Sequence, residues 1–111
     1  MGKKIIKTDN APGAVGPYSQ GTTGNGMVFT AGQVPLIPGT KNIAGGGIQE
    51  QTRQSLTNVK GVLEAAGTKI ENVMKVTVFL KDMNDFAAMN EVYATFFTEN
   101  PPARSAVEVA R

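Results

Sequence analysis

The sequence of 111 residues contains no histidine and no cysteine. These two absences exclude Ser-His-Asp and Cys-His nucleophilic sites, zinc sites built on imidazole or thiolate, haem ligation by histidine, and disulfide bonds. They also leave no side chain with an ordinary pKa near neutrality. We therefore expect any chemistry to use arginine, lysine, tyrosine, hydroxyl groups, carboxylates, the backbone and water.

Long apolar runs and targeting signals are missing as well. No stretch approaches the ~18 apolar residues that a membrane span requires, and no signal-peptide-like apolar run follows the basic start of the chain. The net charge is only +2, and the one basic cluster is Lys3, Lys4 and Lys7, with no basic stripe interleaved with aromatic residues. We expect a soluble cytoplasmic protein whose partners include neither membrane nor nucleic acid.

Hydrophobic periodicity divides the chain into seven segments. Apolar residues alternate in strand-like runs and recur at steps of three and four in two helix-like runs. The predicted segments are strands or extended runs at 5–6, 18–23, 27–31, 74–80 and 104–110, and helices at 48–66 and 86–96. The order β-β-β-α-β-α-β predicts an α+β fold in one domain, residues 1–111, since domains most often hold about 100–150 residues.

Turn and cap residues mark the ends of several segments. Asn25-Gly26 between two strand-like runs predicts a hairpin with a type I′ turn. Gly67 stands where a glycine commonly terminates a helix, and Asp82 or Asn84 can cap the second helix. These signals indicate the positions of the segments and pair the two strands beside Asn25-Gly26, without showing how the other strands pair.

Two helices can cover only one face of a five-stranded sheet. The other face must then meet water or another subunit. In the strand at 74–80 both faces are partly apolar, because Phe79 lies opposite Met74 and Val76. This composition favours a second subunit, so we expect an oligomer.

Three residues stand out for their chemistry. Arg104 follows two prolines at the head of a strand, where its planar guanidinium could hold a carboxylate or form a salt bridge with Glu108. Tyr18 follows Gly-Pro, so its phenol could point into a cleft or simply be half-buried with a wet hydroxyl. Asn90 interrupts the apolar side of the second helix, either as a satisfied buried amide or as a pocket-lining group.

Five segments together resemble the reactive-intermediate deaminase family (RidA, YjgF-like, long labelled L-PSP endoribonuclease). The resemblance keeps nearly the same register over essentially the whole chain, and PARS-x-VEVAR is its most specific signature. The segments are GPYSQ at 16–20, AGQVPL at 31–36, QTRQSLTNVKGVLEAAG at 51–67, VFLKDMNDFAAMNEVY at 78–93 and PPARSAVEVAR at 101–111.

The resemblance implies a fold, an assembly and an activity. The fold is a chorismate-mutase-like mixed β-sheet with two helices packed on one face, and the assembly is a homotrimer with clefts between subunits. Members close to RidA act as 2-iminobutanoate/2-iminopropanoate deaminases, hydrolysing 2-imino acids to 2-oxo acids and ammonia without a cofactor or metal. Such a reaction suits a protein without histidine or cysteine, because an imine carbon is already electrophilic.

The same resemblance assigns roles to five residues. Arg104 matches the carboxylate-binding arginine, and Tyr18 matches a tyrosine that lines the same cleft from the neighbouring subunit. Gly32 matches a glycine whose backbone faces the substrate, and Asn90 matches an asparagine of the second helix. Backbone groups near Ala106 and Gly32 would hold the imine nitrogen and the attacking water.

The sequence departs from the family pattern at three places. Ala31 stands where many members carry serine, and Ala106 stands where RidA-like members usually carry cysteine. The sequence ends at Arg111, whereas family chains continue into a last strand with a glutamate that orients the attacking water. From this we expect an unpaired sheet edge and a site without that acid. A carboxylate-binding protein without turnover therefore remains an alternative, and an RNA-cleaving translation inhibitor is a weaker one.

Overall fold

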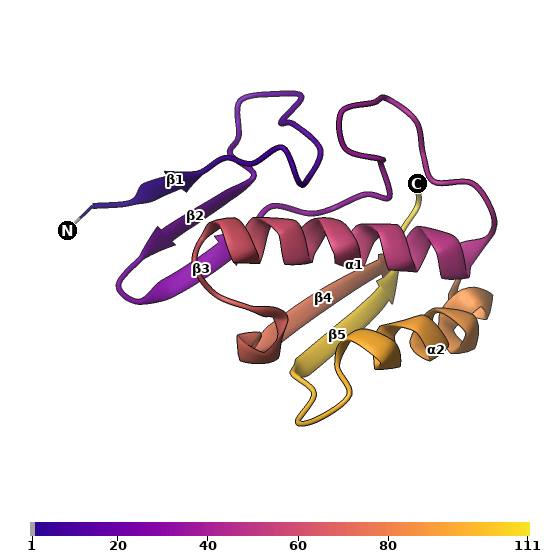
Figure 1. Ribbon diagram of the computed structural model, residues 1–111. Helices are drawn as coiled ribbons and strands as arrows, with labels where there is room; N and C mark the ends of the chain where they lie inside the picture. Colours follow the sequence, from indigo (N-terminus) through magenta and orange to yellow (C-terminus); the bar gives the residue numbers. More distant parts are fainter. Residues whose placement is uncertain (1) are drawn as a thin grey trace.

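The computed structural model describes residues 2–111, so only Met1 of the predicted domain lies outside it. The elements follow the predicted order, with short 3₁₀ turns at 70–72 and 83–85. They are β1 (Lys4–Ile6), β2 (Gly21–Gly24), β3 (Met27–Thr30), α1 (Ile48–Ala65), β4 (Lys75–Leu80), α2 (Phe86–Phe96) and β5 (Ala103–Glu108). Figure 1 shows both helices lying over the same side of the strands. The predicted α+β class and the placement of the helices are confirmed.

The turn between β2 and β3 has the predicted conformation. Asn25 has φ 52° and Gly26 has φ 75°, so both central residues occupy the left-handed region that a type I′ turn requires. The flanking residues Gly24 and Met27 pair across the hairpin. The Asn-Gly signal therefore fixed both the position of the turn and the register of this strand pair.

The predicted end of α1 is confirmed, whereas the predicted cap of α2 differs from the one observed. Gly67 follows α1 with φ 87°, as predicted for a terminating glycine. Asp82, however, does not cap α2 directly. Its carboxylate accepts a hydrogen bond of 2.9 Å from the backbone N–H of Asn84 and so caps the 3₁₀ turn that leads into α2. The helix itself begins at Phe86 after that turn, because the turn already satisfies the first backbone donors.

The strands form two hydrogen-bonded groups, where the sequence analysis predicted one mixed sheet. β1, β2 and β3 form an antiparallel sheet in that order, and β4 pairs with β5 in parallel. In residues 2–111 no ladder joins β3 to β4 or β5. Periodicity shows which residues form strands and which face each presents, but pairing depends on where the helices carry the chain.

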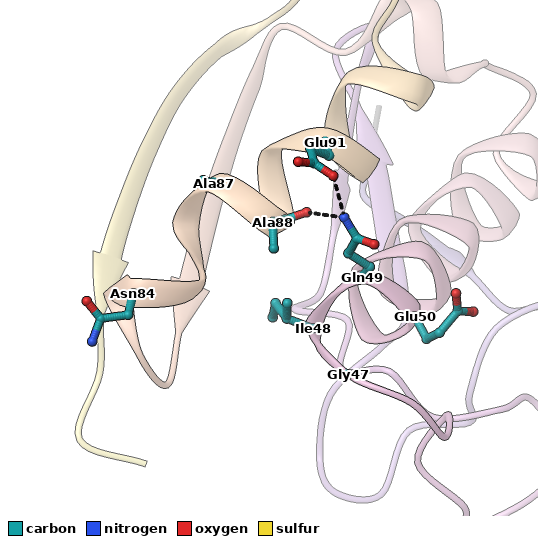
Figure 2. Close-up of a pocket in the computed structure, with 8 residues that line it drawn as sticks. All are labelled: Gly47, Ile48, Gln49, Glu50, Asn84, Ala87, Ala88 and Glu91. Atoms are coloured by element: carbon teal, nitrogen blue, oxygen red, sulfur yellow. Dashed lines mark hydrogen bonds between the residues drawn. The ribbon is translucent and has the colours of Figure 1, made fainter.

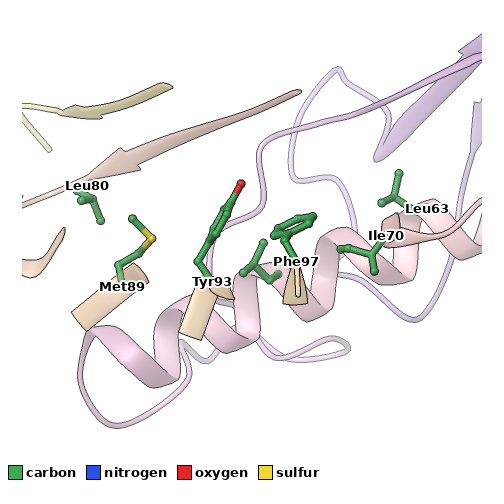
Figure 3. Packing of buried hydrophobic residues seen from close by; sticks show 7 residues of the cluster. Leu63, Ile70, Leu80, Met89, Tyr93 and Phe97 are labelled. Carbon is green, nitrogen blue, oxygen red and sulfur yellow. The ribbon is translucent and has the colours of Figure 1, made fainter. Parts of the chain in front are cut away.

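The core lies between the two helices and the inward face of the strands. Side chains from α1, the 3₁₀ turn at 70–72, β4, α2 and the residue after α2 form one buried cluster. Figure 3 shows its packing around Met89, Tyr93 and Phe97. Val28 of β3 packs against the same cluster, so both strand groups share one core although no ladder connects them. The cluster consists of Leu56, Leu63, Ile70, Leu80, Met89, Tyr93 and Phe97.

The strand face opposite the helices carries large exposed apolar side chains. Phe29 of β3 is 60% exposed and Phe79 of β4 is 66% exposed. Ile5 and Val107 are exposed on β1 and β5, and Val107 lies beside Phe79 in the parallel ladder. The two-sided apolar character inferred for the strand at 74–80 is thus present, while the oligomer inferred from it stays a prediction.

Within residues 2–111, neither helix combines the length and the apolar character needed to cross a lipid bilayer.

Candidate functional site

Arg104 is the second residue of β5, directly beside Val76 of β4. Its half-buried side chain reaches α2, where Nη1 donates a hydrogen bond of 2.7 Å to Oδ1 of Asn90. The alternative salt bridge with Glu108 does not form. No carboxylate lies within 4.0 Å of the Arg104 guanidinium in residues 2–111, and Glu108 instead accepts a hydrogen bond of 2.8 Å from the backbone N–H of Met83.

Two aromatic rings of α2 also contact the Arg104 guanidinium. Its Cζ lies 4.7 Å from the ring centroid of Tyr93 and 5.2 Å from that of Phe86, within the range of cation–π attraction. Neither aromatic residue is among the site residues predicted from the sequence. The available signal was the spacing of Phe86, Asn90 and Tyr93, which puts all three on one helix face.

Tyr93 contributes its ring but makes no hydrogen bond. Its side chain is buried, and in the described chain its hydroxyl has no hydrogen-bond partner. Burial raises the pKa of the Tyr93 phenol above its ordinary value, and the positive charge of Arg104 lowers it by a smaller amount. In Figure 3 the hydroxyl points away from the helices, toward the strand layer. Tyr93 is therefore a neutral phenol beside a permanent cation.

Most donors of the Arg104 guanidinium remain unused. Only Nη1 takes part in a hydrogen bond with the described residues, which leaves the edge formed by Nε and Nη2 without an acceptor. These atoms are not among the buried unpaired ones, since the hydroxyl of Tyr93 alone has that status in residues 2–111. A guanidinium with one open edge is suited to bind a planar carboxylate through two parallel hydrogen bonds.

Ala106 lies two residues after Arg104, on the same face of β5. It pairs with Val78 of β4, and both it and Arg104 are half-buried, while the intervening Ser105 is exposed on the opposite face. The predicted residues Arg104, Asn90 and Ala106 are thus brought to one side of the β4–β5 pair.

Tyr18 and Gly32 lie elsewhere, in loops next to the antiparallel sheet. Tyr18 is half-exposed, and its hydroxyl accepts a hydrogen bond of 3.3 Å from the backbone N–H of Val15. Gly32 follows β3 in an exposed position, and a Cβ added there would meet nothing within 4 Å. In residues 2–111, Tyr18 makes no hydrogen bond with Arg104 or Asn90, so a single chain does not join the two halves of the predicted site.

A surface groove lies apart from the predicted residues. It is an open hollow of about 680 Å³ between the start of α1 and the exposed side of α2 (Figure 2). Its polar groups satisfy one another, since Gln49 donates to the carboxylate of Glu91 at 2.7 Å and to the carbonyl of Ala88 at 3.3 Å. Because the groove contains no unpaired charged group aimed into it, we assign it no role.

Metal-binding side chains do not gather in the described part of the chain. No group of three or more histidine, cysteine, aspartate or glutamate residues is close enough there to hold a metal ion. The candidate site therefore consists of Arg104, the amide of Asn90 and the adjacent backbone of β5.

The fold and this site define an α+β protein with an arginine suited to a small carboxylate. The family described as Endoribonuclease L-PSP matches residues 8–111 of the chain. This match spans nearly the whole sequence, and the chain belongs to that family.

Relatives with assigned names support the same family. A RutC family protein of Pyrococcus horikoshii is 57% identical over 98% of this chain and 86% of its own length. The 2-iminobutanoate/2-iminopropanoate deaminase of Salmonella typhimurium is 53% identical over 97% of this chain and 86% of its own length. Among solved structures, that of Escherichia coli TdcF with bound serine superposes with a TM-score of 0.92 at 50% sequence identity. The match covers 97% of this chain and 87% of the TdcF chain.

Proposed function

We propose that this protein is a deaminase that hydrolyses small 2-imino acids, such as 2-iminobutanoate and 2-iminopropanoate, to 2-oxo acids and ammonia. The observation that carries the proposal is the Arg104 guanidinium, which has no carboxylate partner in residues 2–111 and keeps one edge free. Two relatives support the choice of substrate, because one is named for this activity and another binds serine, an amino acid with a carboxylate.

Arg104 would anchor the substrate. Its Nε and Nη2 would donate to the two carboxylate oxygens, while Asn90 keeps Nη1 fixed at 2.7 Å. The imine carbon, which is bonded to the carboxylate carbon, would then lie near the backbone of Ala106 on the same strand face. Fixing the carboxylate orients the electrophilic carbon toward water, which is the main requirement for a substrate that is already reactive.

The reaction needs water and no redox partner. The water oxygen forms a bond to the imine carbon, and a proton from that water passes to the nitrogen to give a carbinolamine. The hydroxyl proton of this intermediate then passes to the nitrogen, and as the carbon–oxygen double bond forms the carbon–nitrogen bond breaks, which releases ammonia and leaves the 2-oxo acid. Backbone groups near Ala106 and Gly32 are the proposed partners of the nitrogen and the water.

We propose a homotrimer, with sites between subunits, as the active assembly. Support comes from the apolar strand face opposite the helices, where Phe29 and Phe79 are more than half exposed. Tyr18 and Gly32 are separate from Arg104 in one chain, and a neighbouring copy could supply them. Localisation in the cytoplasm completes the proposal.

The direct test follows ammonia release from 2-aminoacrylate produced by an amino-acid dehydratase. The protein should accelerate release above the buffer rate, and Arg104→Ala should lower kcat/KM at least about a hundredfold, because two charge-assisted hydrogen bonds are lost. Arg53→Ala is the matched control, since Arg53 lies exposed on α1 and pairs with Glu50. A wild-type rate equal to that of buffer would refute the activity.

A second candidate function is the binding of small carboxylates without turnover. It is favoured by the position of Glu108, whose carboxylate is engaged with the backbone of Met83 and not with the site. Calorimetry with 2-oxobutanoate separates the two functions. Binding that depends on Arg104, combined with the absence of deaminase activity, would select the binding protein.

A further inference from the structure

One face of α2 supplies every described side chain that contacts the Arg104 guanidinium through a cation–π or hydrogen-bond contact. Phe86, Asn90 and Tyr93 are spaced by four and then three residues, so they follow one another along the same side of the helix. The two rings lie at 5.2 Å and 4.7 Å from Cζ, and the amide oxygen lies between them in sequence at 2.7 Å from Nη1. A substrate-binding arginine is thus held by a helix that belongs to the core.

The nature of these contacts matters for binding. A carboxylate partner would neutralise the guanidinium, and further amide partners would occupy its donors. An aromatic ring attracts the cation through its face and leaves the N–H groups in the guanidinium plane free. The two rings can therefore restrain the side chain without competing with a ligand carboxylate.

We propose that Phe86 and Tyr93 are positioning residues that hold the Arg104 guanidinium in its carboxylate-binding orientation through their ring faces. This inference rests on the proposed function only for its kinetic consequence, since the restraint itself is a property of the free protein. Asn90 fixes one corner of the guanidinium, and the rings limit its rotation about the remaining bonds.

The role belongs to the ring of Tyr93 and not to its hydroxyl. The hydroxyl has no hydrogen-bond partner in residues 2–111. The Tyr93 ring, in contrast, lies closer to Cζ of Arg104 than the Phe86 ring does. Tyr93→Phe preserves the ring, and Tyr93→Leu removes it. Since Tyr93 is also a core residue, Phe86→Leu provides a second variant at a half-buried position that tolerates change better.

The first measurement is the NMR signal of the Arg104 Nε–H group in the free protein. Protons near ring faces are shielded, so we expect this signal upfield of that of Arg53, which is exposed and pairs with Glu50. Phe86→Leu should move the signal toward the Arg53 position. Phe96→Leu is the matched control, because Phe96 is a half-buried ring of the same helix and makes no cation–π contact with Arg104 in the described residues.

The second measurement separates binding from turnover. Phe86→Leu should raise KM about three- to tenfold with kcat changed less than about twofold, and Phe96→Leu should leave both unchanged. Tyr93→Leu should also raise KM, whereas Tyr93→Phe should keep the KM of the wild-type protein. Equal effects of Phe86→Leu and Phe96→Leu, or equal losses in Tyr93→Phe and Tyr93→Leu, would overturn the proposal.

The positioning role of the two rings can be tested whether or not the protein has deaminase activity. If the wild-type protein releases no ammonia, the proposed function fails, and the Nε–H shift together with calorimetric affinity for 2-oxobutanoate still decides the role of the rings. An Arg104 signal that coincides with that of Arg53 in the wild-type protein would overturn it even if the enzyme is active.

Discussion

Arg104 on β5 and Tyr18 in the loop before β2 are predicted to contact the same substrate, yet the protein holds them in different ways. Arg104 is restrained by side chains of α2 that pack into the core, with contacts across fourteen residues of sequence. Tyr18 is half-exposed, and its hydrogen bonds are to Val15 and Gly16 in its own loop. The surroundings of Arg104 are therefore formed by another element of the same chain, whereas Tyr18 is held by its own loop.

The two strand groups differ in how they attach to the helices. β4 contributes Leu80 to the buried cluster and pairs with β5, whereas β1–β3 reach the core through Val28 and approach α1 closely at glycine positions. A Cβ added to Gly21 of β2 would lie 2.7 Å from Val62 of α1, and one added to Gly61 would collide with the carbonyl oxygen of Asn10. Small residues thus bring the antiparallel sheet and its loops against α1.

After Arg104→Ala, the largest effect is expected from Asn90→Asp. A carboxylate at this position would pair with the Arg104 guanidinium and oppose the binding of a ligand carboxylate, with a loss of about 1.5–3 kcal/mol, or roughly ten- to a hundredfold in affinity. Calorimetry with 2-oxobutanoate measures the change. Asn84→Asp, at an exposed position just before α2, is the control. Wild-type affinity in Asn90→Asp would show that the guanidinium is not the anchor.

Gly61→Ala tests how the antiparallel sheet β1–β3 and its loops are attached to α1. The added methyl group would press on the backbone of Asn10, and overpacking of this kind costs about 1–3 kcal/mol. The melting temperature should fall by about 4 °C or more, with hydrogen exchange faster in β1–β3 than in β4–β5. Lys60→Ala, on the exposed side of the same turn, should change little. A higher melting temperature in Gly61→Ala would mean that helix propensity outweighs the contact.

The smallest effect is expected from Tyr18→Phe, which removes one hydroxyl from an exposed loop. Loss of the proposed hydrogen bond from this hydroxyl to the substrate, worth about 0.5–1.5 kcal/mol, should lower kcat/KM about two- to tenfold. The bond of 3.3 Å that the hydroxyl accepts from the N–H of Val15 is exposed, so its loss should change the melting temperature little.

A mixing experiment sharpens this prediction. Tyr18→Ala and Arg104→Ala subunits, each of low activity alone, should regain activity when refolded together, because some shared sites would then contain both native residues. If mixing restores nothing, Tyr18 and Arg104 do not meet across a subunit boundary.

Local signals predicted the elements well because each depends on neighbouring residues. Asn25-Gly26 gave the hairpin and Gly67 gave the end of α1, since both positions need left-handed backbone. The same reasoning offered Asp82 or Asn84 as the cap of the second helix, but it did not predict the 3₁₀ turn at 83–85 that precedes α2, and neither side chain caps α2 itself. Strand pairing was less predictable, because register and neighbours depend on contacts between distant segments.

The candidate site was predicted in part. Residue chemistry alone indicated Arg104, Tyr18 and Asn90 as candidates, and the family resemblance added Gly32 and Ala106. Sequence spacing could not decide whether Arg104 pairs with Glu108 or keeps its guanidinium open. Both residues lie on β5, but their actual hydrogen-bond partners, Asn90 and Met83, come from other segments. The rings of Phe86 and Tyr93 were not predicted as part of the site. Tyr93 belongs to the core cluster, Phe86 packs against it, and both rings also face a cation.

The sequence by itself determined the element order, the hairpin, the exclusion of histidine and cysteine chemistry, and the family. These features follow from local backbone preference and from the side chains that are present. Only the tertiary structure decided that Arg104 meets Asn90 and two aromatic rings, and that its free edge stays open. The reason is geometric: β5 and α2 are joined by a short loop, but the facing side chains are set by how both elements pack on the shared core.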